Sequence, residues 1–191
     1  MYDSDEELVV MGYTDASFMT DPDDFKSQSG YVFTLKGGAM SWKSSKQNMV
    51  VDSTTEAKYN AASEASKEGY WIKKFVTELG VVPSAEDPME LYCDNSGAVA
   101  QAREPRSHQK SKHIERRYHK IREFIDKGYV KVCKIHTDLN ISDPMTYVTP
   151  VSHWCERTYV TSIIVSSATG RLLDKCPRGN NKMDYYLYPC S

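Results

Sequence analysis

The sequence has few cysteines and no arrangement of them that would bind zinc or staple a small domain. The five cysteines are odd in number, widely spaced and without any CxxC pair: Cys93, Cys133, Cys155, Cys176 and Cys190. A disulfide framework needs paired cysteines, and a zinc knuckle needs closely spaced ones. The sequence therefore indicates free thiols in a reducing compartment.

Long apolar runs and an excess of positive charge are absent as well. No stretch approaches the roughly 20 apolar residues of a membrane-spanning helix, and the opening MYDSDEELVV is acidic, unlike a signal or transit peptide. The net charge is only -2 over 191 residues, so any attraction to a polyanion has to come from a local patch. We expect one ordinary domain with a buried core and no membrane partner.

The first pattern that the sequence does contain is a set of short strands. Residues 8–15 (LVVMGYTD) are rich in β-branched and aromatic side chains and end in an acid, Asp15, which is typical of a buried strand. Residues 30–35 and 39–44 form two further predicted strands. They are joined by Lys36-Gly37-Gly38, a tight hairpin signal because glycine reaches positive φ without strain. These three strands are expected to form an antiparallel meander.

A long helix is predicted over residues 54–79, before Gly80 as a stop. Apolar residues recur near helical spacing in it: Ala57, Ala61, Ala65, Trp71, Ile72 and Phe75. Together with Trp42, we expect Trp71 to lie in the core.

The rest of the pattern alternates strands and helices. A short strand over residues 89–94 ends in Asp94, after which Ser96 is expected to cap a short helix. A helix over 112–127 precedes a strand over 129–136 that alternates as an edge strand does, and Asp143 begins a last helix.

This order predicts an α/β fold with a five-stranded mixed sheet flanked by helices. The first three strands form the antiparallel meander, and strands four and five are parallel strands that return through helices.

Four acidic residues stand at the ends of these predicted elements: Asp15, Glu56, Asp94 and Asp143. If the first and fourth strands are parallel neighbours, Asp15 and Asp94 end at the same edge of the sheet. Glu56 joins them only if its helix begins over that edge. Clustered carboxylates repel one another, so such a group usually holds hard cations. Two magnesium ions about 4 Å apart, which manganese could replace, would suit phosphodiester hydrolysis.

Several of these acids also have a purely structural interpretation. Ser53 and Glu56 fit a capping box ahead of the long helix, Asp15 suits a turn, and Asp143 suits an N-cap. Asp94 is harder to explain in this way, because an acid directly after a buried strand is costly unless it is paired or metal-bound. Both interpretations of Glu56 stay open at this point.

Six stretches, in this order, resemble the ribonuclease H domain at the C-terminal end of Ty1/copia-type retrotransposon polyproteins: GYTDAS, SQSGYVFTLKGGAMSWKSSKQ, STTEAKY, YCDNSGA, KHIERRYHKIRE and NISDPMT. The resemblance delimits an RNase H-like domain over residues 8–146, after an acidic extension of residues 1–7. The tail, residues 147–191, does not match. A shifted frame, a retained intron or a fused sequence is our hypothesis for its origin.

The resemblance implies an RNase H-like fold and magnesium-dependent cleavage of the RNA strand of RNA/DNA hybrids during reverse transcription. It implies that Asp15, Glu56, Asp94 and Asp143 are the catalytic and metal-binding acids, and that the reverse transcriptase domain of the same polyprotein is a partner. The expected location is the cytoplasm, in a virus-like particle if the element is active, with the nucleus as an alternative. The glutamate comes second among the acids, which favours hydrolysis over the strand transfer of integrases with the same fold.

Basic residues on the helix predicted over 112–127 are candidates for substrate binding, because a basic stripe would follow phosphates. The main candidates are Arg116, Arg117 and Lys120. The alternative is a solvated helix face with i,i+4 pairs such as Glu123 with Lys127.

Polar residues beside the acids are further candidates. Asn95 and Ser96 follow Asp94 directly and could contact the 2′-hydroxyls that distinguish RNA from DNA. His136 precedes Asp143 and is a candidate helper in catalysis.

Two other functions stay open. One is a catalytically degenerate retroelement fragment that binds nucleic acid or a protein, which the unmatched tail favours. The other is a nuclease of the same fold that acts on duplex DNA. The presence of all four acids favours hybrid cleavage.

Overall fold

The structure, a computed structural model, describes residues 9–80, 87–104 and 120–146. In this part of the chain five strands form one sheet in the order β3-β2-β1-β4-β5. The strands are β1 Val10–Ser17, β2 Gln28–Leu35, β3 Gly38–Lys46, β4 Met89–Cys93 and β5 Val130–Lys134. The pairs β1–β2 and β2–β3 are antiparallel, whereas β1–β4 and β4–β5 are parallel. The predicted fold class is confirmed, and β5 is an edge strand as expected.

The hairpin between β2 and β3 turns at Lys36 and Gly37, whose φ angles are 49° and 72°. Two successive positive φ angles are the feature of type I′ turns, which match the right-handed twist of paired strands. The tight hairpin predicted from this Gly-Gly segment is therefore confirmed.

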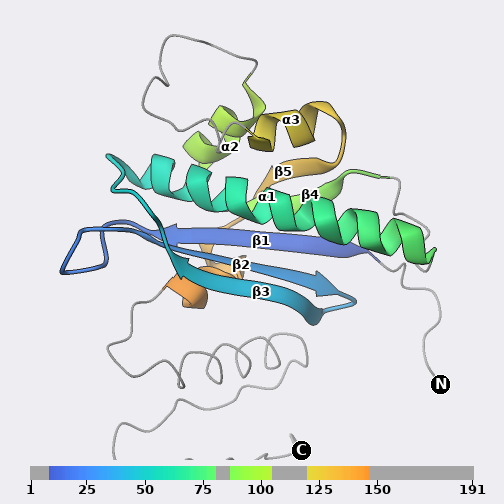
Figure 1. Cartoon of the computed structure of the whole chain (residues 1–191), viewed down its shortest axis with the longest axis horizontal. Coiled ribbons are helices and arrows are strands. Elements are labelled where there is room, and N and C mark those ends of the chain that lie inside the picture. Colours follow the sequence, from blue (N-terminus) through green and yellow to red (C-terminus); the bar gives the residue numbers. More distant parts are fainter. Residues whose placement is uncertain (1–8, 81–86, 105–119, 147–191) are drawn as a thin grey trace, which may run out of the picture.

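The helices α1 Thr54–Leu79, α2 Ser96–Arg103 and α3 Lys120–Asp126 cover one face of the sheet (Figure 1). Two short 3-10 helices follow, η2 Thr137–Leu139 and η3 Asp143–Thr146. Met145 of η3 packs with Val32 of β2 in a separate small cluster, on the face of the sheet opposite α1 (Figure 1). Within the described residues, none of the helices combines the length and apolarity needed to cross a membrane.

The start of α1 is set by local hydrogen bonds. The Glu56 N–H donates to Ser53 Oγ at 3.2 Å, and the Asp52 N–H donates to Glu56 Oε2 at 3.1 Å. The helix ends at Gly80, whose φ of 65° is left-handed and favours glycine. The N-cap role of Ser53 and the predicted stop at Gly80 are both confirmed, whereas Glu56 accepts the N–H of Asp52, one residue before the N-cap that a capping box would use.

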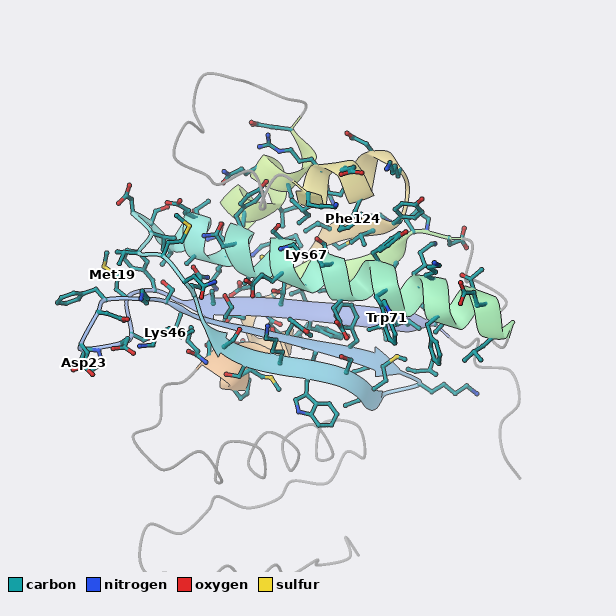
Figure 2. The ribbon with its side chains drawn as sticks, viewed as in Figure 1. Met19, Asp23, Lys46, Lys67, Trp71 and Phe124 are labelled. Carbon is teal, nitrogen blue, oxygen red and sulfur yellow. The ribbon has the colours of Figure 1, made fainter. Side chains whose placement is uncertain are left out.

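The buried stripe of α1 packs on the sheet, but two of the aromatic residues expected there do not belong to it. Ala57, Ala61, Ala65 and Ile72 are buried as predicted, whereas Trp71 is 60% exposed (Figure 2). One residue turns the helix by about 100°, so Trp71 points away from the face that carries Ile72.

Phe75, 44% exposed, stacks on Trp71 with ring centroids 5.5 Å apart. Trp42 is 41% exposed because it lies on β3, an edge strand whose positions are all exposed or only partly buried. The predicted core positions of Trp42 and Trp71 are therefore wrong, and Phe75, which also follows the helical spacing, is exposed as well.

Two further expectations need correction. Asn95, not Ser96, is the N-cap of α2: it has extended backbone angles, and its Oδ1 accepts the Ala98 N–H at 2.8 Å. The helix predicted over 112–127 is described only from Lys120 on, where α3 agrees with it, and its earlier part stays a prediction. Asp143 begins a single 3-10 turn, with Pro144 inside it. Residues 1–7 and 147–191 lie outside the described residues, so the predicted domain boundaries stay predictions.

The segment that carries Asp143 is held tightly against the sheet. Asn140 Nδ2 donates to the Thr14 carbonyl at 3.1 Å, and Ser44 Oγ donates to the Met145 carbonyl at 2.6 Å. Gly30 permits this approach, because a β-carbon there would lie 2.6 Å from Cβ of Met145. Gly30 is also the register partner of Asp15, so this contact lies beside the first predicted acid.

Candidate active site

Asp15 and Asp94 lie next to each other at the carboxyl ends of two central parallel strands. The register pairs Thr14 of β1 with Cys93 of β4, so the next residue of each chain segment is an aspartate. Both side chains are almost fully buried, with 4% and 5% exposure. The prediction that these two acids meet at one edge of the sheet is confirmed, although β1 continues two residues beyond Asp15.

Lys58 of α1 bridges the two aspartates. Its Nζ lies 2.8 Å from Asp15 Oδ1 and 2.6 Å from Asp94 Oδ1. Figure 1 shows why a residue near the start of α1 can reach this place: the helix begins at the end of the sheet where β1 finishes. The result is a buried group of two carboxylates and one ammonium.

The chain after β5 completes the surroundings of Asp94. Thr137 Oγ1 donates to Asp94 Oδ2 at 3.1 Å, and the ammonium of Lys134 donates to the Asp94 backbone carbonyl. The carboxylate of Asp94 is therefore oriented from α1 on one side and from η2 on the other.

Burial and charge act against each other on this group. Burial raises the pKa of Asp15, and the negative charge of Asp94 raises it further, which together outweigh the lowering by Lys58. For Lys58, burial by itself would lower the pKa, but the hydrogen bonds and charges of the two aspartates raise it overall. The lysine is thus held in its charged form by the pair that it bridges.

One oxygen of the pair, Asp15 Oδ1, is buried with the Lys58 ammonium 2.8 Å away as its charge partner. Carboxylate oxygens are the ligands that a hard cation takes. With Asp94 beside Asp15, the chemistry of this edge fits magnesium or manganese, and Asp15 and Asp94 are the residues that would hold the ion.

Glu56 and Asp143 are not joined to the aspartates as a ready metal cluster. Within the described ranges, no group of three or more Asp, Glu, His or Cys side chains is arranged so that it could hold a metal ion. The Glu56 carboxylate accepts the Asp52 N–H of the cap, and Asp143 belongs to η3. The assignment of Asp15, Glu56, Asp94 and Asp143 as a catalytic set therefore stays a prediction.

Of the polar candidates, Asn95 has a structural role in this arrangement. Asn95 Oδ1 caps α2 and is 3.5 Å from Thr55 Oγ1, while Ser96 is exposed at the first position of α2. His136 is turned toward Asp138: its Nδ1 accepts the Asp138 N–H at 3.4 Å, and its side chain is 74% exposed. Thr137, which follows His136 in the chain, contacts Asp94 instead.

The basic residues of the described helices are mostly engaged with the protein. Arg122 donates to the Gln101 carbonyl and so ties α3 to α2. Lys127 pairs with Glu123 at 2.7 Å, which confirms the solvated i,i+4 pair for these two residues. Lys120 is exposed at the start of α3. Arg116 and Arg117 lie outside the described residues, so their role in substrate binding stays a prediction.

Three residues of the site were missed by sequence reasoning: Lys58, Thr137 and Asn140. Lys58 had a recognisable signal, because this lysine follows the predicted acid Glu56 by two residues in STTEAKY. Thr137 and Asn140 had none, since their contacts join segments more than 40 residues apart.

Comparison with known proteins identifies the fold first. No protein-family model matches the chain. Among solved structures, LC11-RNase H1, isolated from compost by a metagenomic approach, is similar with a TM-score of 0.53 and 18% sequence identity, over 72% of this chain and 91% of that chain. The fold, with two aspartates at the ends of its central strands, defines an RNase H-like domain.

Sequence relatives narrow the family. The Pol polyprotein of transposon TNT 1-94 from Nicotiana tabacum is 44% identical over 142 residues, 74% of this chain. That of transposon RE2 from Arabidopsis thaliana is 38% identical over 139 residues, 73% of this chain. The chain belongs to the RNase H-like domains of Ty1/copia-type retrotransposon polyproteins. It spans only 10% and 9% of the lengths of these two relatives.

Proposed function

We propose that the domain is a magnesium-dependent endoribonuclease that cleaves the RNA strand of RNA/DNA hybrids during retrotransposon reverse transcription. The observation that carries the proposal is the pair of buried carboxylates, Asp15 and Asp94, at adjacent ends of parallel strands on an RNase H-like fold. The kinship with Pol polyproteins supports the same activity.

The residues of this site would act by position and charge. Magnesium, when bound, supplies activation of water and neutralisation of the phosphate charge. Asp15 and Asp94 would hold it, and Glu56 and Asp143 complete the acidic set in this proposal. Thr137 fixes the rotation of the Asp94 carboxylate through its hydrogen bond. Because both aspartates extend from strands of one sheet, their spacing changes little while substrate binds.

The proposed substrate contacts are the polar and basic residues that the sequence suggests. Asn95 and Ser96 follow Asp94 directly and would contact the RNA strand, whereas Lys120, Arg116 and Arg117 would contact phosphates. His136 would assist catalysis only after turning away from Asp138. The reverse transcriptase domain of the same polyprotein is the proposed partner, in the cytoplasm or a virus-like particle, with the nucleus as an alternative.

A panel of labelled substrates tests this proposal. The full chain is incubated with RNA/DNA hybrid, duplex DNA and duplex RNA, each with magnesium, manganese or a chelator. We expect cleavage of the RNA strand of the hybrid alone, with products that carry 5′-phosphate and 3′-hydroxyl ends, and no cleavage with chelator. Cleavage of duplex DNA would assign a different nuclease of this fold, and cleavage that survives the chelator would contradict the proposed cofactor.

A pair of substitutions separates the capping role of Glu56 from its proposed catalytic role. Ser53→Ala removes the cap and should lower stability by about 1 kcal/mol without changing the cleavage rate. Glu56→Gln retains an oxygen for the Asp52 N–H but loses the charge, so stability should change little while cleavage falls by at least about tenfold. Thermal unfolding and single-turnover cleavage measure the two effects. Unchanged cleavage by Glu56→Gln would leave Glu56 only a cap.

A catalytically degenerate fragment that binds nucleic acid or protein is the second candidate function. The observation that favours it is Lys58, which occupies both aspartates, together with the capping contact of Glu56. Salt-sensitive binding of hybrid without cleavage under any metal condition would support this second function.

A further inference from the structure

Lys58 lies where a divalent cation would bind the two aspartates. Its Nζ is 2.8 Å from Asp15 Oδ1 and 2.6 and 2.8 Å from the two carboxylate oxygens of Asp94. Magnesium binds oxygen at about 2.0–2.1 Å. An ammonium at these distances and an ion bridging the same oxygens cannot share the space, so one has to leave when the other enters.

The backbone that carries Lys58 is fixed in place. Its neighbours Ala57 and Tyr59 are fully buried, and the Ala57 carbonyl accepts a hydrogen bond from Gln47 Nε2 at 2.9 Å. The Lys58 side chain is 16% exposed. Lys58 therefore reaches the aspartates from a rigid helix turn and is not a surface lysine that happens to fold over them.

We propose that Lys58 is a built-in counter-ion of the Asp15–Asp94 pair, which holds the two carboxylates together in the absence of a divalent cation and competes with that cation for them. This inference rests on the proposed metal site. One ammonium balances only one of the two carboxylate charges, so the pair keeps an attraction for a cation. The nearby positive charge weakens that attraction, because like charges repel strongly at short range in a partly buried site.

Two effects follow from this role. Without the ammonium, two buried carboxylates would repel each other, so the metal-free protein should lose stability. The same change should raise the affinity for divalent cations, and cation binding should then restore the lost stability, because a ligand that binds the folded state stabilises it. Lys58 would thus make the stability of the fold independent of metal, and it would weaken metal binding at the same time.

Direct manganese binding by the full chain tests the proposal. Isothermal titration with Mn²⁺ and thermal unfolding, with chelator or with Mn²⁺, are compared for the wild type, Lys58→Met and Lys58→Gln. Lys74→Met is the matched control, since Lys74 is on the same helix, is 64% exposed and pairs with Glu78. We expect both Lys58 variants to bind Mn²⁺ at least about tenfold more tightly than the wild type. In chelator, both Lys58 variants should unfold at a lower temperature than the wild type, and Mn²⁺ should raise their unfolding temperature by more. Lys74→Met should behave as the wild type.

Equal Mn²⁺ affinity in the wild type and both Lys58 variants would overturn the proposal, as would failure of both variants to fold even with Mn²⁺ present. Lys58→Gln is included in case Lys58→Met does not fold, because the glutamine amide can still donate hydrogen bonds to the carboxylates. The binding readout is independent of cleavage. Tighter Mn²⁺ binding by the Lys58 variants, with no hybrid cleavage by the wild type, would support the counter-ion role and refute the proposed nuclease. Hybrid cleavage by the wild type, with equal Mn²⁺ affinity in all variants, would support the nuclease and refute the counter-ion role.

Discussion

Asp94→Asn is expected to reduce magnesium-dependent cleavage of an RNA/DNA hybrid roughly a thousandfold, as loss of a central catalytic group does. The substitution removes the charge of the proposed metal ligand but retains its size and its place after β4. Lys58 keeps Asp15 as a partner at 2.8 Å, so the variant should fold. Single-turnover cleavage with excess protein measures the loss, and circular dichroism confirms the fold.

Asp23→Asn is the matched control for this experiment. Asp23 is exposed in the loop between β1 and β2 (Figure 2), and its substitution should leave cleavage unchanged. A cleavage rate for Asp94→Asn within about threefold of the wild type would remove Asp94 from the catalytic set.

Phe33→Ala is expected to have the largest effect on stability, with a loss of about 3–5 kcal/mol in the free energy of unfolding. Phe33 is 1% exposed, and its ring lies against Gly12 of β1 and Gly69 of α1. It therefore fills the interface between the sheet and α1, the helix that carries Lys58. Small domains have only about 5–15 kcal/mol of total stability, so the loss would be a large fraction, and urea unfolding measures it.

Phe25→Ala provides the comparison, because Phe25 is 60% exposed in a loop and its truncation leaves no internal cavity. We expect less than about 1 kcal/mol from it. If Phe33→Ala also lowered the free energy of unfolding by less than about 1 kcal/mol, the interface between the sheet and α1 would have to repack around the smaller side chain.

Local patterns were sufficient for much of the fold. The Lys36-Gly37 turn, the N-cap Ser53 and the stop at Gly80 depend on neighbouring residues, and all three are found as predicted. The antiparallel meander and the parallel fourth and fifth strands were also predicted from the alternation of elements. The full strand order came from the structure, because the pairing of the first strand with the fourth was only a condition of the prediction. The apolar stripe of α1 was predicted less well, because approximate helical spacing does not separate Trp71 from Ile72, two neighbours that point about 100° apart.

The sequence by itself determined the fold class, which depends on periodicity and turn chemistry, and the family, which six motifs in order indicate by resemblance. The meeting of Asp15 and Asp94 was predicted on the condition that the first and fourth strands are parallel neighbours, and the structure supplies that pairing. Only the tertiary structure decided which groups surround that pair. Lys58 reaches it because α1 begins over the end of β1, and Thr137 reaches it because the chain turns into η2 after β5. Such contacts depend on the positions of whole elements in space, which residue spacing along the chain does not encode. For the same reason, the sequence could predict the two acids and the helix cap, but not that the ammonium of Lys58 lies between the acids.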